Sequence, residues 1–232
     1  MAIFAIGDTH LSFGADKPMD VFRGWQDYVS RLEKNWRALV SPADTVVIPG
    51  DVSWAMQLSA AKADFAFLDA LPGQKILLKG NHDYWWTTMR KMQDFLTQNG
   101  FSTLRILHNN AYLVEGISVC GTRGWFFDAA EEAADKVLLR EVQRLKASIA
   151  AGRALGGRPV VFLHYPPVTQ TQRCEPILDA LREEGVTECF YAHLHGASIA
   201  SAFQGELAGI RFSLVSGDAL GFCPKRLEKR KS

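Results

Sequence analysis

The sequence predicts an α/β fold whose N-terminal half is built from strand–helix–strand units. Short apolar runs alternate with longer segments in which apolar residues recur every three or four positions, as on one face of a helix. The apolar runs are continuous, which is typical of strands buried on both faces. Polar residues follow several of these runs directly, as they do where open parallel sheets bind ligands. Such alternation implies crossover connections and parallel pairing.

The first hundred residues are predicted to alternate between strand and helix. The strands are predicted at the largely apolar runs 2–6, 45–48 and 75–78. The helices are predicted over 22–39, 58–71 and 84–98, and the first shows the clearest spacing, from Phe22 through Trp36 to Leu39. Pro42 and Pro72 stand where the first two helices end, because proline cannot continue a helix.

The second half is less regular. Short strands are predicted at 103–107, 111–115 and 117–121, followed by a glycine-punctuated aromatic loop at 121–127. The next helix carries Leu138, Val142, Leu145 and Ile149 on one face. The glycine-rich segment 151–159 is predicted to be a surface loop and the main internal hinge. Beyond it the sequence predicts strands at 160–163, 188–192 and 210–216, with a helix at 175–184.

The composition is that of an ordinary globular protein. Of the 232 residues, 47% are hydrophobic and 22% are charged, and the net charge is +1. We expect a single domain over 1–232. The near-neutral charge argues against a surface made throughout for nucleic acid. The basic residues gathered at 225–232 predict a solvated, flexible tail.

The cysteine pattern and the N-terminus indicate a cytoplasmic protein. The four cysteines are widely separated, which fits reduced thiols better than a disulfide framework or a zinc finger. The first predicted strand begins at residue 2, without the basic region, apolar core or cleavage site of a signal peptide. No apolar run approaches the ~20 residues needed to span a bilayer, so we expect no membrane partner.

Five of the six histidines lie at or just beyond the ends of apolar strands. They are His10, His82, His164, His193 and His195, while His108 is interpreted as a surface turn residue. Asp8, Asp51 and Asn81 occupy equivalent positions. A single such histidine is usually a packed core residue. Buried carboxylates and imidazoles in this number are costly unless something pairs them, and metal ions would do so.

The spacing and chemistry of these residues favour two metal ions. Residues two apart on an extended chain project to the same side, so Asp8 can converge with His10, and His193 with His195. Imidazole, carboxylate and amide donors suit Mn, Fe, Co, Ni or Zn, and the lack of cysteine argues against a purely structural zinc site. These candidate ligands are too many for one tetrahedral ion but are enough for two ions that share a carboxylate. Asp51 is the predicted bridge.

The sequence resembles the calcineurin-like metallophosphoesterases in five motifs. These are Asp8-x-His10, Gly50-Asp51, Gly80-Asn81-His82-Asp83, His164 and His193-x-His195, in the order that the family shows. The resemblance implies a β-sandwich of two mixed sheets flanked by helices, with two divalent or di- and trivalent transition-metal ions. It further implies that Asp8, His10, Asp51 and His195 hold one ion, and that Asp51, Asn81, His164 and His193 hold the other.

The resemblance also implies a hydrolytic mechanism. The two ions would activate a bridging hydroxide for in-line attack on a phosphomonoester or phosphodiester. His82 would face the substrate and, when protonated, assist the leaving group. Asp83 would orient the His82 ring and favour its imidazolium form.

Several residues near the motifs are candidates for substrate binding. Arg123 could clamp a phosphate, Trp125 could stack on a ring, and Tyr165 adjoins a predicted ligand, although all three could simply be packing residues. The expected partner is a small phosphate ester, and we expect a monomer or weak dimer.

One alternative function is that of a nuclease of the double-strand-break-repair type, which the short, nearly neutral chain does not favour. The other is a non-catalytic binding scaffold, and the presence of every motif argues against it.

Overall fold

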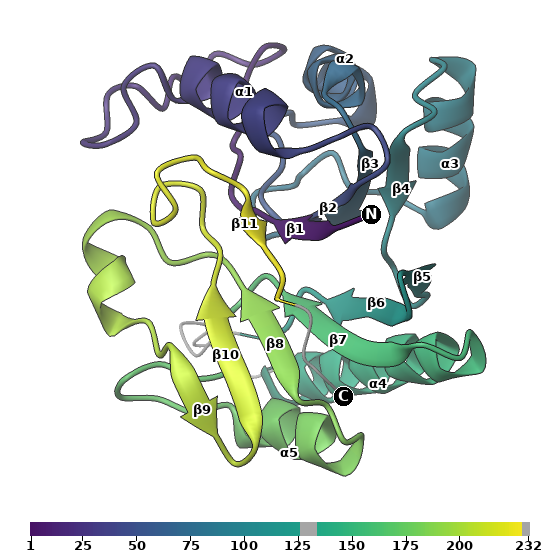
Figure 1. Cartoon of the computed structure of the whole chain (residues 1–232). Coiled ribbons are helices and arrows are strands. Elements are labelled where there is room, and N and C mark those ends of the chain that lie inside the picture. Colours follow the sequence, from purple (N-terminus) through teal and green to yellow (C-terminus); the bar gives the residue numbers. More distant parts are fainter. Residues whose placement is uncertain (126–133, 229–232) are drawn as a thin grey trace.

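The computed structural model describes residues 1–125 and 134–228. Two mixed sheets lie face to face in the middle of the molecule, with helices on their outer surfaces (Figure 1). The strands of the first sheet are β1 (Ile3–Ala5), β2 (Thr45–Pro49), β3 (Gln74–Leu78), β4 (Leu104–Ile106) and β11 (Lys225–Arg226). Those of the second are β5 (Tyr112–Val114), β6 (Ile117–Thr122), β7 (Arg158–Leu163), β8 (Glu188–Tyr191), β9 (Gly205–Leu207) and β10 (Ile210–Leu214). The predicted β-sandwich with flanking helices is confirmed.

Both sheets have parallel centres and antiparallel edges. The five-stranded sheet has the order β11-β1-β2-β3-β4, in which β1 to β4 run parallel and β11 is antiparallel. The six-stranded sheet has the order β5-β6-β7-β8-β10-β9, with β5 and β9 as its antiparallel edges. Parallel pairing brings the carboxyl ends of neighbouring strands to the same edge of a sheet, which is where the polar residues lie.

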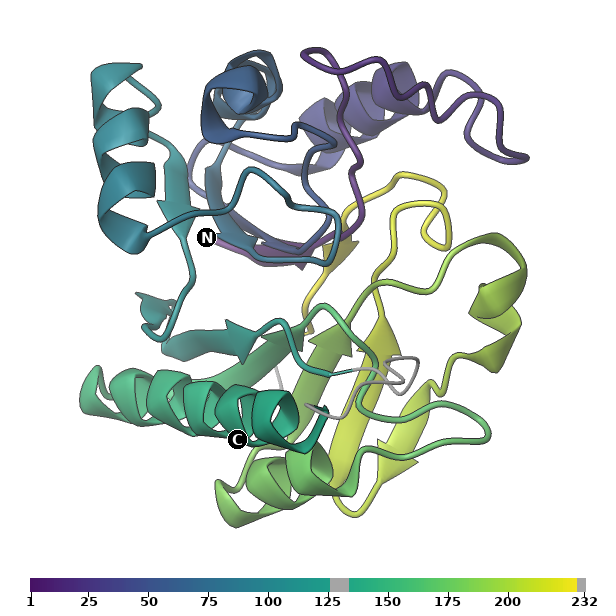
Figure 2. The ribbon, with the colours of Figure 1, turned by 180° about the vertical axis from the view of Figure 1, so that it is seen from behind.

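The helices cover the outer faces of the two sheets (Figure 2). α1 (Tyr28–Leu39), α2 (Lys62–Ala70) and α3 (Met89–Gln98) lie on the five-stranded sheet, and a short 3₁₀ turn, η1 (Leu58–Ala61), precedes α2. α4 (Ala134–Ala154) and α5 (Glu175–Glu183) lie on the six-stranded sheet, and a second 3₁₀ turn, η2 (Gly196–Ser201), follows β8. None of the helices in the described residues is long and apolar enough to cross a membrane.

Successive residues of the central strands pack into different hydrophobic layers. Phe4 and Val46 contact the helices of the first sheet, whereas their neighbours Ala5 and Val47 face the second sheet. On β7, Val161 likewise belongs to the layer under α4 and α5. Both faces of these strands are therefore covered by apolar side chains, which explains why their sequences are continuous apolar runs.

Three predicted boundaries were wrong. α1 begins at Tyr28 rather than at residue 22, because Gly24 (φ 89°) and Asp27 (φ 51°) adopt left-handed backbone that interrupts a helix. α3 begins at Met89 rather than at 84, and Thr88 caps it by accepting a hydrogen bond from the backbone of Lys91. The predicted hinge at 151–159 is largely regular structure, since α4 continues to Ala154 and β7 starts at Arg158.

The C-terminal segment differs from the predicted flexible tail. Lys225 and Arg226 pair with β1 as strand β11, and the Leu227 side chain is buried. The edge strand β9 was not predicted at all. Residues 126 and 127 of the predicted aromatic loop, and 229–232 of the predicted tail, lie outside the described residues.

Candidate metal centre

The candidate ligands lie on loops that leave the carboxyl ends of strands in both sheets. Asp8 and His10 follow β1, Asp51 follows β2, and Asn81 follows β3. From the other sheet, His164 follows β7, while His193 and His195 follow β8. The two sheets are joined at this edge, because the backbone of Gly7 donates to Val215 (2.7 Å) and that of His193 donates to the Asp8 carboxylate (3.0 Å).

The side chains form two groups that share one carboxylate. Asp8, His10, Asp51 and His195 make up one group, and Asp51, His164 and His193 make up the other. Within each group one ligand atom from every residue lies within 4.8 Å of the others. Asn81 joins the second group, since its Oδ1 lies 2.6 Å from His164 Nε2. Asp51 is thus the residue common to both groups.

The nitrogen and oxygen atoms that could bind a metal face one another, but no hydrogen atom lies between them to form hydrogen bonds. Pro49 O can only accept, so His164 donates to it from Nδ1 (3.1 Å), and in a neutral ring Nε2 is then a bare acceptor. That bare nitrogen faces the Asn81 oxygen, and it lies 3.6 Å from Asp51 Oδ2, which has no hydrogen-bond partner in the described structure. Acceptors that converge in this way fit a cation between them.

The Asp8 group shows the same arrangement. His195 Nε2 lies 3.6 Å from Asp8 Oδ1 and 3.3 Å from His10 Nε2. The other nitrogen of His195, Nδ1, lies 3.4 Å from the Asp218 carboxylate, which orients the ring toward the group. Asp218 was not predicted as a site residue. The Gly217-Asp218 turn after the last strand was the available sequence signal.

Without bound cations, the surroundings disfavour the charged forms of these side chains. Burial, followed by repulsion from Asp83 and Asp8, raises the pKa of Asp51 well above its usual range. Burial likewise raises the pKa of Asp8 to about 6. Burial and neighbouring histidines lower the pKa values of His10 and His164 well below the usual value. Neutral imidazoles and clustered carboxylates are the forms that bind divalent cations, so the residues present fit such ions.

Left-handed backbone places several of these ligands. Asp8 (φ 54°), His10 (φ 41°), Asp51 (φ 50°) and His193 (φ 74°) all have positive φ, which is uncommon outside glycine. Such conformations persist only where the surrounding structure enforces them, and they cluster at functional sites. Gly80 meets a related demand, because a Cβ there would lie 2.1 Å from Asp51 Oδ1.

Asp83 does not have the predicted role of orienting the His82 ring. Its two buried oxygens accept hydrogen bonds from the backbone of Asp51 (2.9 Å), Val52 (2.8 Å) and Gly80 (2.7 Å). They also accept from Ser53 N and from the indole of Trp85. Asp83 therefore holds the β2 and β3 loops together around Asp51, and the prediction that it acts through His82 was wrong.

The His82 ring is half-buried beside the Asp8 group. Its centroid lies 5.9 Å from that of His10 and 4.5 Å from that of Trp54, and its Nδ1 lies 3.3 Å from the Tyr84 hydroxyl. Burial and the nearby His195 lower the pKa of His82. The protein alone therefore favours the neutral ring, whereas the predicted role of His82 needs the imidazolium. Trp54 and Tyr84 were not predicted as site residues, because aromatic residues next to a turn usually pack.

The three predicted substrate-binding residues border one cavity beside the metal centre. Arg123, Trp125 and Tyr165 all line it. The Tyr165 ring lies 4.6 Å from the His193 ring, and the Arg123 guanidinium lies 5.9 Å from the Tyr165 centroid. His108, predicted to be a surface turn residue, is half-buried and lines the same cavity.

Comparisons with known proteins agree with the fold described above. The family model described as calcineurin-like phosphoesterase matches residues 1–197. Among solved structures, a protein of unknown function from Aquifex aeolicus is similar with a TM-score of 0.52 and 16% identity, over 97% of this chain and 95% of its own. Phosphopantetheinyl hydrolase from Mycobacterium tuberculosis is similar with a TM-score of 0.54 and 15% identity, over 100% and 98%. At these identities the similarity shows the fold alone. A search of curated protein sequences finds no match.

Proposed function

This chain belongs to the calcineurin-like phosphoesterase family, and from that membership we propose that it is a metal-dependent phosphohydrolase. The substrate would be a small phosphomonoester or phosphodiester. The observation that carries the proposal is the position of Asp51, whose carboxylate belongs to both ligand groups. A fold neighbour that bears the name phosphopantetheinyl hydrolase is consistent with hydrolysis.

The chain's own donors divide between two cations. Asp8, His10, Asp51 and His195 would hold one, and Asp51, Asn81, His164 and His193 the other. When bound, such ions neutralise phosphate charge and lower the pKa of water toward neutrality. Mn, Fe, Zn, Co and Ni all accept this mixture of imidazole, carboxylate and amide donors.

His82 would move a proton to the leaving oxygen. Its ring lies beside the Asp8 group, and one ring nitrogen is anchored near the Tyr84 hydroxyl. A bound phosphate dianion raises the pKa of a neighbouring imidazole, which offsets the lowering by burial and His195. Protonation of His82 would then accompany substrate binding, and Arg123 and Tyr165 would border the substrate on the other side.

The proposal is tested with Asp51→Asn, which keeps the shape of the side chain but removes the shared charge. We expect the wild type to retain two metal equivalents and to hydrolyse p-nitrophenyl phosphate or its bis-ester. In the variant, both metal content and turnover should fall, the latter by ~10²-fold or more. Asp94→Asn is the matched control, because Asp94 is an exposed carboxylate on α3 and should change neither quantity.

Two outcomes would contradict the proposal in different ways. Cleavage of DNA oligonucleotides without hydrolysis of either small ester would indicate a nuclease. Two bound metals with no hydrolysis of any of these substrates would indicate a binding scaffold.

A further inference from the structure

A basic cavity adjoins the candidate metal centre and contains none of its ligands. Its volume is about 440 Å³, and its walls come from the end of β3, the β4–β5 turn, the loop after β6 and the first turns of α4. Tyr165 links the two places, because it lines the cavity while its ring lies 4.6 Å from the His193 ring. A volume in this range is typical of small-molecule sites.

The charges around this cavity are unbalanced. Lys79, Arg123, Arg140 and Arg144 line it, against one carboxylate, Glu141. The Glu141 side chain is fully buried, and both of its oxygens are engaged, one by Arg144 Nη1 (2.6 Å) and the other by Thr122 Oγ1 (2.5 Å).

The ion pair with Glu141 neutralises Arg144 and leaves three cations in excess. Lys79, Arg123 and Arg140 form no ion pair within residues 1–125 and 134–228. The positive potential extends to His108 on the same wall, whose pKa is lowered by burial and then by the charge of Arg144. Guanidinium groups match phosphate oxygens in geometry, and like charges gathered around a cavity favour a multiply charged anion.

We propose that this cavity binds a second phosphate group of the substrate, so that the enzyme acts on small bisphosphorylated molecules. One phosphate lies at the candidate metal centre, and the other lies among Lys79, Arg123 and Arg140. Water adds its OH to the first phosphorus and its proton to the leaving oxygen, so the ester P–O bond breaks and the second phosphate is unchanged. The inference rests on the proposed phosphohydrolase function.

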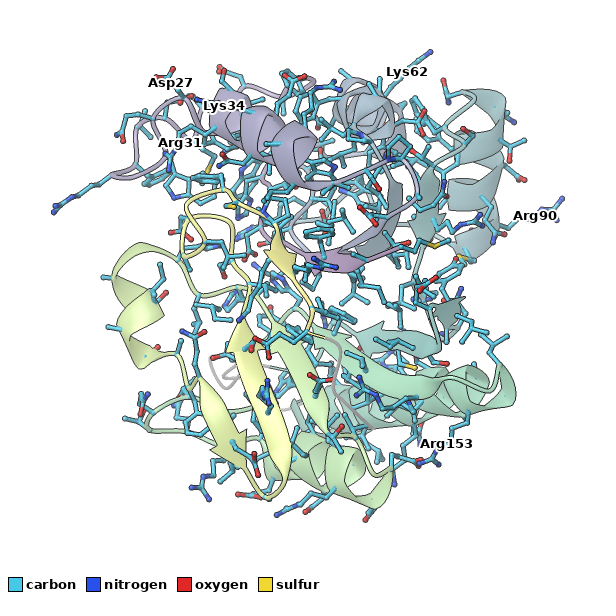
Figure 3. All side chains as sticks on the ribbon, viewed as in Figure 1. Asp27, Arg31, Lys34, Lys62, Arg90 and Arg153 are labelled. Atoms are coloured by element: carbon cyan, nitrogen blue, oxygen red, sulfur yellow. The ribbon has the colours of Figure 1, made fainter. Side chains whose placement is uncertain are left out.

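The first experiment compares adenosine 3′,5′-bisphosphate with adenosine 3′- and 5′-monophosphates as substrates. We expect kcat/KM to be about tenfold or more higher for the bisphosphate, as befits a charge-assisted contact. Arg140→Gln should abolish most of this preference by raising KM for the bisphosphate. The control is Arg90→Gln, because Arg90 projects from α3 into solvent (Figure 3), and it should keep the preference. An equal preference for the bisphosphate in Arg140→Gln and Arg90→Gln would overturn the inference.

The second experiment measures binding without turnover. In a full-length Asp51→Asn background, calorimetry with adenosine 3′,5′-bisphosphate should show binding that Arg140→Gln weakens about tenfold and Arg90→Gln leaves unchanged. Equal affinity in the two double variants would reject the cavity as a phosphate site. Absence of hydrolysis by the wild type would instead reject the proposed function, while this binding result still decides the fate of the cavity.

Discussion

The backbone of His82 makes a contact that does not depend on its imidazole ring. Its backbone N–H donates to Asp51 Oδ1 (2.8 Å), so removal of the side chain leaves this support of the shared carboxylate in place. The ring itself lies between Trp54 and the Tyr84 hydroxyl. Trp54 also stacks on His10 at 4.9 Å, so the rings of His82, Trp54 and the candidate ligand His10 pack against one another.

We therefore expect His82→Ala to separate metal binding from turnover. Metal content should stay at the wild-type level, while turnover of an aryl phosphate should fall by ~10²–10⁴-fold, as for loss of a general acid. Metal analysis and steady-state kinetics on the same preparation measure both. Undiminished turnover would exclude His82 as the proton donor, and loss of metal would make it a structural residue.

The difference between His82 and Asp83 shows where residue-level prediction ends. The motif locates both residues at a strand end, and the structure places both next to Asp51. Sequence order alone suggests that neighbours in a motif act on each other. The carboxylate of Asp83 instead accepts hydrogen bonds from the backbone of four loop residues, because those buried N–H groups need acceptors.

The turn between α2 and β3 is closed by a buried lysine. Lys75 is fully buried on β3, and its ammonium group donates to the backbone carbonyls of Leu71 (2.6 Å) and Gly73 (2.8 Å). These acceptors lie just beyond the end of α2, where carbonyl groups lack helical partners. Burial nevertheless lowers the pKa of Lys75 from 10.5 to about 8.

This shift predicts a pH-dependent contribution to stability. Between pH 8 and 10.5 the unfolded chain holds a proton on Lys75 that the folded chain has released. The free energy of unfolding should therefore rise with pH across this window, relative to Lys75→Met, by up to about 3 kcal/mol. Urea unfolding of both proteins at pH 7.5, 9 and 10 measures the difference. If the free energy of unfolding relative to Lys75→Met stayed constant or decreased with pH, the lowered pKa of Lys75 would be contradicted.

Elements with covered apolar faces were predictable, and those without them were not. β2, β3 and β7 are continuous apolar runs because a sheet and a layer of helices cover them. β9 and β11 are short edge strands with exposed residues, so their sequences carry no comparable pattern. The start of α1 was misjudged because Phe22 continues the helical spacing although it lies in an exposed turn.

The C-terminal segment ties the two sheets together. After β10 the chain leaves the six-stranded sheet and returns as β11 to the edge of the five-stranded sheet (Figure 1). Phe4 pairs with Arg226, Leu227 donates to Ile3 O (2.8 Å), and the Leu227 side chain packs between the sheets.

Deletion of 225–232 should therefore destabilise the whole molecule. We expect the free energy of unfolding to fall by about 3 kcal/mol, from the lost burial of one leucine and the lost strand hydrogen bonds. Deletion of 229–232 alone is the control and should have little effect, because β11 and Leu227 remain. Thermal and urea unfolding of the three chains test this, and equal stability of the two truncated forms would show that β11 contributes nothing.

The location of the site could be predicted from the sequence, but its geometry could not. Polar residues after apolar runs identified all seven candidate ligands and the shared Asp51. The left-handed backbone at Asp8 and Asp51 was invisible, because it arises from contacts between segments far apart in the chain. The support that Asp218 gives to His195 was missed for the same reason.

Each ligand group takes donors from both sheets, and this has a consequence for biosynthesis. The first group needs Asp8 and His195, and the second needs Asp51 and His193, so neither is complete within one half of the chain. A nascent polypeptide emerging from the ribosome cannot assemble either group until residues 193–195 have been translated. Binding of cations at these groups would therefore be a late event in maturation, and a product terminated before residue 193 would complete neither group.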